Sequence, residues 1–152
     1  MNKIRFIRTD STNPDFIRLV KALDEDLAIK DGVEHSFYAQ FNKVDKIKYA
    51  IVAYEGNESV GCGAIKEYDN TSVEVKRMYT DPSQRGKGIA TKILKELEDW
   101  AKELSYKRCV LETGKRQPDA VALYEKNEYI RIPNYGQYTG IENSVCFEKI
   151  IT

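Results

Sequence analysis

The residues best suited to chemistry lie in a short basic loop. Arg85, Gly86, Lys87 and Gly88 directly precede the strongest helix pattern of the chain. Free backbone N–H groups at a helix start, together with the helix dipole, form an anion site. The glycines let a phosphate approach the backbone, and the two basic side chains add positive charge. The loop is therefore interpreted either as a phosphate or pyrophosphate site or as a basic turn that caps a helix.

Two common nucleotide-binding motifs are missing from this loop. The P-loop pattern GxxxxGK[ST] is absent because Gly88 is followed by Ile89. The dinucleotide pattern GxGxxG fails as well, since Ile89-Ala90-Thr91 follows where a third glycine is needed. These departures argue against a nucleoside triphosphatase and against a dinucleotide-dependent enzyme.

The composition is that of an ordinary globular domain. The chain has 152 residues, 41% hydrophobic and 32% charged, and no linker or repeat divides it, so we expect one domain over residues 1–152. Basic and acidic residues both number 24, and this balance argues against nucleic acid as the main partner. There is no apolar run of the roughly 18 residues that a membrane span needs, and the N-terminus carries charges where a signal peptide is apolar. We therefore expect a cytoplasmic protein with no membrane span.

Metal and disulfide chemistry are not expected. The single histidine, His35, excludes a multi-histidine metal site. The three cysteines Cys62, Cys109 and Cys146 are odd in number and lack CxxC spacing, so they predict neither a zinc site nor a disulfide framework. Each lies in an apolar, strand-like segment, which predicts buried free thiols.

Helix and strand patterns alternate along the chain and predict an α/β or α+β sheet protein. Apolar residues recur every three or four positions from Ile89 to Leu104, which predicts the main helix. Asn13 and Pro14 suit the cap and first turn of an earlier helix, which Asp31-Gly32 ends. The expected order is strand 4–8, helix 14–30, short helix 35–41, strands 48–54, 59–68 and 71–79, helix 89–104, strand 108–113, helix 118–126, and strands 129–133 and 144–150.

Three segments in this order resemble the GNAT superfamily of acyl-CoA N-acyltransferases. Residues 85–90 (RGKGIA) match the R/Q-x-x-G-x-G/A signature of that family. Residues 77–82 (RMYTDP) are similar to its strand-and-proline lead-in, and residues 120–129 (AVALYEKNEY) look like its A-x-x-L-Y-x-x-x-G-F/Y segment. The element order is also the family's. The resemblance covers nearly the whole chain and is weakest before about residue 45.

The resemblance implies an α/β (α+β) fold with a mixed, mostly antiparallel sheet of seven strands and about four helices. The sheet is expected to be splayed between its fourth and fifth strands, where the pantetheine arm of acetyl-CoA would enter. Acetyl-CoA is the implied cosubstrate, and no metal is implied. The coenzyme contacts that the resemblance implies are Met78, Tyr79, Thr80, Arg85, Gly86, Lys87, Gly88, Ile89, Ala90, Thr91 and Gln117.

The resemblance also implies an N-acetyltransferase that acts on a primary amine, with a small molecule as the expected acceptor. Tyr124 matches the family tyrosine near the coenzyme sulfur, where a phenol can protonate the departing thiolate. Glu74, eleven residues before Arg85, matches the position of the family's general base. The alternative for Glu74 is a surface strand residue paired with Lys76.

Strand alternation makes a prediction about the surroundings of Glu74. Side chains along a strand point alternately to its two faces. On that basis Glu74, Lys76 and Met78 lie on one face, and Val73, Val75 and Arg77 lie on the other.

The acceptor site is expected among residues from both ends of the chain. In this family the first two helices and the loop between the last two strands border the acceptor. His35, Tyr135, Gln137 and Tyr138 are therefore candidate substrate residues. The alternatives are a solvated residue at a helix start for His35 and an ordinary hairpin loop for the other three.

Two positions depart from the family pattern. The asparagine that often lies seven residues before the tyrosine is Gln117 here, which keeps an amide group but changes its reach. The usual glycine after the last helix is Glu128. Asparagine tolerates left-handed backbone geometry, so Asn127 is expected to end this helix in place of the glycine.

Other functions remain open at the level of sequence. The acceptor amine could belong to a protein N-terminus or a lysine side chain. A non-catalytic acyl-CoA sensor would keep the loop at residues 85–90 without needing Glu74 or Tyr124. A nucleotide-binding protein is a third reading of the same loop. A homodimer is the oligomeric state that the resemblance suggests.

Overall fold

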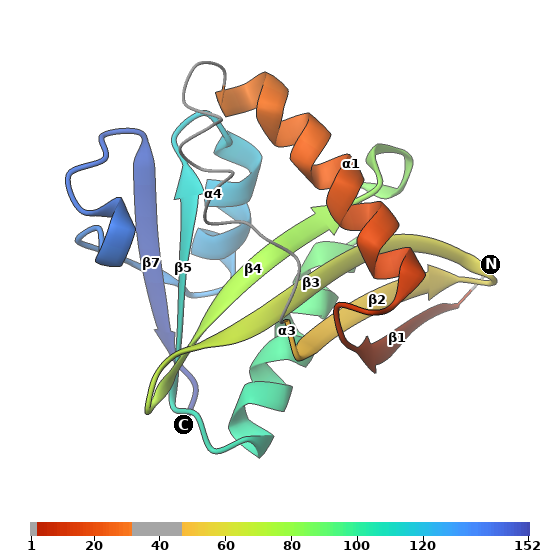
Figure 1. The fold of residues 1–152 in the computed structure, drawn as a ribbon, viewed down its shortest axis with the longest axis horizontal. Helices are drawn as coiled ribbons and strands as arrows, with labels where there is room; N and C mark the ends of the chain where they lie inside the picture. Colours follow the sequence, from red (N-terminus) through yellow and green to blue (C-terminus); the bar gives the residue numbers. More distant parts are fainter. Residues whose placement is uncertain (1–2, 32–46) are drawn as a thin grey trace.

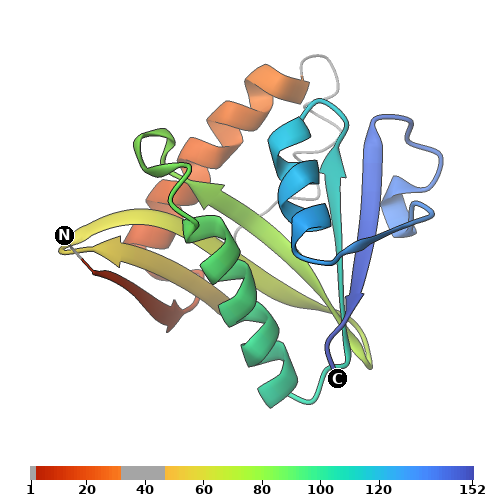
Figure 2. The same cartoon turned by 180° about the vertical axis from the view of Figure 1, so that it is seen from behind.

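A computed structural model describes residues 3–31 and 47–152, which form a seven-stranded mixed sheet with helices on both faces. The strand order is β1-β2-β3-β4-β5-β7-β6, and among the paired strands of the described residues only β4 and β5 run parallel. Helix α1 lies on one face, and α3 and α4 lie on the other (Figures 1 and 2). The strands are β1 (Ile4–Thr9), β2 (Tyr49–Glu55), β3 (Glu58–Asp69), β4 (Ser72–Thr80), β5 (Arg108–Gly114), β6 (Ile130–Ile132) and β7 (Ser144–Ile150). The helices are α1 (Pro14–Asp31), α3 (Ile89–Glu103) and α4 (Pro118–Lys126), with 3-10 turns η2 (Pro82–Gln84) and η3 (Gly136–Tyr138).

The predicted fold is confirmed, including all seven strands and their order along the chain. Three of the four expected helices lie in the described residues. The predicted short helix over 35–41, with the candidate substrate residue His35, lies outside them. Within the described ranges, no helix is long and apolar enough to cross a membrane.

The splay between β4 and β5 is present and has a defined starting point. Their parallel pairing covers only residues 72–74 of β4 and 108–110 of β5, and the last pair is Glu74 with Val110. Both strands continue beyond this point, β4 to Thr80 and β5 to Gly114. Figure 1 shows the two strands parting from their shared end. Beyond Glu74, the backbone of β4 therefore bonds to β3 on one side and has no strand partner on the other among residues 3–31 and 47–152.

A bulge in β4 corrects the prediction from strand alternation. Arg77 has a left-handed backbone conformation (φ 62°), and the pairing with β3 shifts register between Cys62 and Ala64. The extra residue reverses the facing of the residues that follow. Arg77 therefore points toward α1, where it pairs with Asp24, and Met78 points toward α3. Glu74 and Lys76 stay on the α1 side, so the predicted positions of Met78 and Arg77 were wrong.

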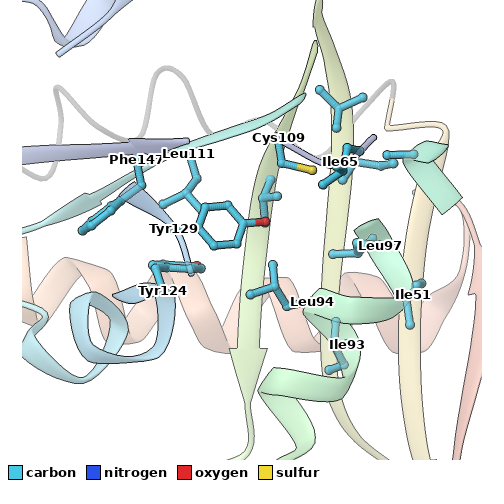
Figure 3. Close-up of a cluster of buried hydrophobic side chains, with 14 of the residues drawn as sticks. Ile51, Ile65, Ile93, Leu94, Leu97, Cys109, Leu111, Tyr124, Tyr129 and Phe147 are labelled. Carbon is cyan, nitrogen blue, oxygen red and sulfur yellow. The ribbon is translucent and has the colours of Figure 1, made fainter. Parts of the chain in front are cut away.

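The main core lies between the sheet and helices α3 and α4. It includes Ile51, Ile65, Ile93, Leu97 and other fully buried side chains. Figure 3 shows the rings of Tyr124 and Tyr129 packed with β5 and β7 side chains in the same cluster. Burying a side chain of this kind contributes about 1.5–3 kcal/mol, so this cluster anchors α3 and α4 to the sheet.

A second cluster fixes α1 against the opposite face of the sheet. Phe16, Leu19 and Val20 pack on apolar residues of β2 and β3. The N-terminus of α1 is capped as predicted, because the Asn13 side chain accepts hydrogen bonds from the backbone N–H groups of Asp15 (2.8 Å) and Phe16 (3.1 Å). Helix α1 is thereby held beside the splay.

The three cysteines are buried free thiols, as predicted. Burial raises the pKa of Cys62 and Cys109 to about 12 and that of Cys146 to about 11. Because the thiolate is the reactive form, these groups remain unreactive near neutral pH. Their burial also keeps them from contributing to an assay that detects a newly released thiol.

The end of α4 agrees only in part with the sequence prediction. Asn127 ends the helix as its C-cap, as predicted, but its φ is −94° and not left-handed, and its side chain donates a hydrogen bond to the backbone oxygen of Leu123 (2.8 Å). The exposed Glu128 takes the left-handed conformation instead (φ 71°). A side chain at such a position is strained by about 1–2 kcal/mol.

Replacing this strained residue is expected to stabilise the protein. Glu128→Gly should raise the free energy of unfolding by about 0.5–1 kcal/mol, because relief of the left-handed strain exceeds the entropy cost of glycine. The neighbouring Asn127→Gly is the matched control and should be destabilising, since its φ is ordinary and its side-chain hydrogen bond is lost. Denaturant unfolding of both variants measures the difference. Equal destabilisation by the two would show that Glu128 is unstrained.

Candidate active site

The basic loop follows directly from the end of β4. The Asp81 side chain accepts hydrogen bonds from the backbone N–H (2.9 Å) and hydroxyl (2.7 Å) of Ser83, which turns the chain into η2. The Arg85 Nε then donates to the backbone oxygen of Thr80 at 2.9 Å. The loop is thus tied to the last residue of β4 before α3 begins.

The loop leaves the start of α3 open to a ligand. Gly86 and Gly88 both have left-handed backbones (φ 82° and 79°), which glycine adopts without strain. A Cβ added at either position would meet no atom within 4 Å. Gly88 caps α3 without any side-chain hydrogen bond, so the first N–H groups of the helix have no side-chain cap. This arrangement suits a phosphate, whose charge the helix dipole also favours.

A cleft of about 460 Å³, here called the outer cleft, lies against this loop. It is bordered by α4, by Leu23, Asp26 and Lys30 of α1, and by the end of β4. All but one of the predicted coenzyme residues line it: Met78, Tyr79, Thr80, Arg85, Gly86, Gly88, Ile89, Ala90, Thr91 and Gln117. The exception is Lys87, whose ammonium group donates to the Gln84 side chain at 2.8 Å and does not line the cleft.

A smaller cavity of about 110 Å³, here called the inner cavity, adjoins the outer cleft. The two share Leu23, Met78, Gln117, Ala120 and Tyr124 in their walls. The inner cavity is otherwise walled by Leu27, Glu74, Lys76, Arg77, Glu112, Thr113, Gly114 and Tyr138. It therefore occupies the region where β4 and β5 have parted, between α1 and α4.

Both oxygens of the buried Glu74 carboxylate are held. Oε2 accepts a hydrogen bond from the Tyr135 hydroxyl at 2.5 Å, and Oε1 faces the Lys76 ammonium at 3.3 Å. Burial and the neighbouring carboxylate raise the pKa of Tyr135, so its phenol keeps the proton that it donates. Each carboxylate oxygen has two lone pairs, which leaves room for a further donor on each. Glu74 is paired with Lys76, as the alternative expected, but it is not a surface residue, because its side chain is buried in the cavity wall.

Tyr124 lies in the wall shared by the outer cleft and the inner cavity. Helix α4 buries its ring against Tyr129 and Phe147, with ring centroids 5.8 and 6.2 Å away. Burial, and then the Glu112 carboxylate, raise the pKa of Tyr124 above its ordinary value. The phenol therefore stays protonated at neutral pH and carries a proton that it can donate.

The C-terminal loop contributes two of its three predicted residues. Tyr135 reaches Glu74, and Tyr138 is buried in the wall of the inner cavity. The two rings contact each other edge to face, with centroids 5.8 Å apart. Gln137 is exposed and lines neither the cavity nor the cleft.

Sequence reasoning missed three charged residues of the inner cavity. Lys76 was considered only as a surface partner, Glu112 was not singled out, and Arg77 was placed on the wrong face. Strand periodicity could have found Glu112, because it alternates with the buried Leu111 and Thr113. No residue type in the segment marks the bulge that redirects Arg77.

Comparison with known proteins identifies the family. Residues 13–129 match the model of the Acetyltransferase (GNAT) family, which is more than half of the chain. The chain belongs to this family. A Klebsiella pneumoniae protein described as an acyl-CoA N-acyltransferase has a similar crystal structure, with a TM-score of 0.80 and 30% identity over 100% of this chain and 99% of that one. GNAT membership makes the protein an N-acetyltransferase by enzyme class, and the family uses acyl-CoA.

Two relatives show how far the similarity extends. The IAA acetyltransferase of Azospirillum brasilense is 29% identical over 98% of this chain and 99% of its own length. The uncharacterized N-acetyltransferase YsnE of Bacillus subtilis is 36% identical, but the match spans 64% of this chain and 66% of that protein. The structure of the PaiA N-acetyltransferase from Thermoplasma acidophilum in complex with coenzyme A shares the fold, with a TM-score of 0.73 and 17% identity over 97% of this chain and 99% of that one.

A bulky side chain at the loop should block coenzyme binding. Gly88→Trp fills the open space at the start of α3, and we expect the affinity for coenzyme A to fall at least about tenfold as the anion contacts are lost. Gly56→Trp is the matched control, because Gly56 is also left-handed (φ 60°) and open but lies in the distant β2–β3 turn. Calorimetric titration measures both. Unchanged affinity in Gly88→Trp would contradict the assignment of the loop.

Proposed function

We propose that this protein transfers the acetyl group of acetyl-CoA to the primary amine of a small molecule. One observation carries the proposal: a buried carboxylate, Glu74, and a buried phenol, Tyr124, line the same small cavity, which adjoins the cleft at the phosphate loop. A volume of about 110 Å³ suits the end of a small acceptor. The relative from Azospirillum brasilense, matched over nearly its full length, is named for a small-molecule substrate.

The described residues fit acetyl-CoA as the donor. The open backbone at Gly86 and Gly88 and the uncapped start of α3 would take the pyrophosphate. The unpaired side of β4 from Met78 to Thr80 would bond the pantetheine amides as an added strand does. When bound, acetyl-CoA supplies an acetyl group activated as a thioester.

The side chains of the inner cavity would move the protons of the reaction. Glu74 would take the proton that the amine loses on attack, either directly or through a water molecule. The Tyr135 hydroxyl and the Lys76 ammonium hold that carboxylate in place, which fixes the direction from which the amine approaches. Tyr124, kept protonated by its burial, would give its proton to the departing thiolate.

Acetyl-CoA-dependent thiol release against a panel of primary amines tests this function. We expect acetyl-CoA to raise the melting temperature, with ADP and NAD as controls, and an amine-dependent thiol signal. Stabilisation without thiol release from any amine would favour the sensor alternative.

Tyr124→Phe should lower turnover roughly 100-fold while the affinity for coenzyme A stays within about twofold, because the ring still packs. Full turnover in Tyr124→Phe would remove this residue as the acid.

The base is tested by pairing Glu74→Gln with Tyr135→Phe. Glu74→Gln should lower turnover roughly 100-fold, with the largest loss at low pH, where little of the amine is free. Tyr135→Phe keeps the ring and removes only the hydrogen bond to Glu74, so a smaller loss, about tenfold, is expected. Rates are compared from pH 6 to about pH 9, over which the free fraction of an ordinary amine rises. A wild-type profile in Glu74→Gln would mean that another group, or none, acts as the base.

A further inference from the structure

A buried arginine in the inner cavity has donors that no group in the described residues uses. The Arg77 side chain is 1% exposed and lines the inner cavity. Its Nη1 donates to the Asp24 carboxylate of α1 at 2.8 Å. The Nε and Nη2 atoms are buried and have no hydrogen-bond partner in the described part of the chain.

These two atoms form a matched pair of donors. The Nε–H and one Nη2–H of a guanidinium group point in parallel from the same edge, which fits the two oxygens of a carboxylate. Burying a cation costs free energy unless an anion neutralises its charge and accepts its hydrogen bonds. Asp24 does this only in part, because its carboxylate is 43% exposed and accepts a hydrogen bond from a single nitrogen of Arg77.

The bulge in β4 brings this arginine into the site. Regular alternation would direct Arg77 into the apolar cluster on the α3 face, with Val73 and Val75. The left-handed conformation at Arg77 turns its side chain to the α1 face instead, beside Lys76 and Glu74. A non-glycine residue held at positive φ is uncommon, and bulges next to active sites commonly redirect a side chain.

The inner cavity therefore presents both signs of charge. Glu74 and Glu112 would favour a protonated or polarised amine, whereas Arg77 and Lys76 would favour an anion. A purely cationic acceptor such as a polyamine would leave the Nε and Nη2 donors of Arg77 without an acceptor. A molecule with an amine and an anionic group a few bonds apart would satisfy both.

We propose that the acceptor is a small amine that bears a carboxylate, of the amino-acid type, and that the Nε and Nη2 edge of Arg77 binds this carboxylate. The proposal rests on the proposed N-acetyltransferase function and names the substrate class of that site. Arg77 is a specificity residue in this account, and Asp24 holds it through Nη1.

The test compares amino acids with their amides. The intact protein is assayed with acetyl-CoA and the L forms of alanine, leucine, phenylalanine, glutamate and lysine, each against its C-terminal amide. The amide removes the charge of the carboxylate and keeps the rest of the molecule. We expect kcat/KM for at least one amino acid to exceed that for its amide by about tenfold or more, as for a hydrogen bond between charged groups.

Variants separate recognition from structure. Arg77→Met and Arg77→Lys should bring the ratio of kcat/KM for the amino acid to that for its amide close to one, with the KM for acetyl-CoA unchanged. Methionine removes the charge, and lysine keeps the charge but lacks the pair of parallel N–H donors. Asp24→Asn keeps the Nε and Nη2 donors of Arg77 and removes only the charge of its ion-pair partner, so the preference for the amino acid over its amide should survive. A wild-type enzyme that uses amides equally well, or a preference that persists in both Arg77 variants, would overturn the proposal. A preference for aminophosphonates over the matching amino acids would overturn the carboxylate assignment.

A binding experiment tests the carboxylate site independently of the acetyl-transfer reaction. If no amine is acetylated, thermal stabilisation by the same amino acids and amides is measured in the presence of coenzyme A. Stabilisation by an amino acid but not by its amide, lost in Arg77→Lys, would support the carboxylate site although the reaction assignment had failed. Stabilisation by neither, or by both equally, would overturn it.

Discussion

The site depends on one constraint: β4 and β5 stop pairing after Glu74 and Val110, yet both strands continue. A strand edge inside a protein must have its backbone N–H and C=O groups bonded to something. Here no strand of the described fold supplies those bonds, and the gap widens between α1 on one face and α4 on the other. The splay between β4 and β5 therefore leaves backbone groups of β4 to which an extended, amide-bearing ligand can hydrogen-bond.

The elements beside the splay follow one another directly in the chain, so the position of one fixes the position of the next. The unpaired half of β4 leads through the Asp81 turn into the glycine loop and then into α3, which is anchored in the main core. A ligand that bonds along β4 is therefore led to the N-terminus of α3. At the opposite end, where the strands part, Glu74 is held by Tyr135 and Lys76. In the proposed function, coenzyme binding and proton transfer would occupy the two ends of this separation between β4 and β5.

Local patterns predicted most of the fold because periodicity and capping are local properties. The apolar stripe of α3, the Asn13 cap and the seven strands all depend on neighbouring residues. The splay itself came from the family resemblance and not from any pattern in the strands. The loop motif likewise predicted residues that line the outer cleft, except Lys87, whose ammonium group binds the Gln84 side chain instead.

The parts that could not be predicted depend on distant contacts or on strain. Tyr135 and Glu74 are 61 positions apart, and their hydrogen bond exists only once β4 and the C-terminal loop are assembled. The bulge at Arg77 carries no glycine or proline that would mark it, so alternation gave the wrong face. Glu128 adopts the left-handed conformation although Asn127 tolerates it better, because the helix end is fixed by the hydrogen bond from Asn127 to Leu123.

Hydrogen–deuterium exchange of the intact protein with and without saturating acetyl-CoA tests the central claim most directly. If the coenzyme completes the open edge of β4, exchange should slow in peptides covering residues 76–80 and 86–91. Peptides covering residues 4–9 of β1, an outer strand separated from β4 by β2 and β3, should exchange as before. Slower exchange at the loop with no change along β4, or protection confined to other segments, would show that the split between β4 and β5 is not where acetyl-CoA binds.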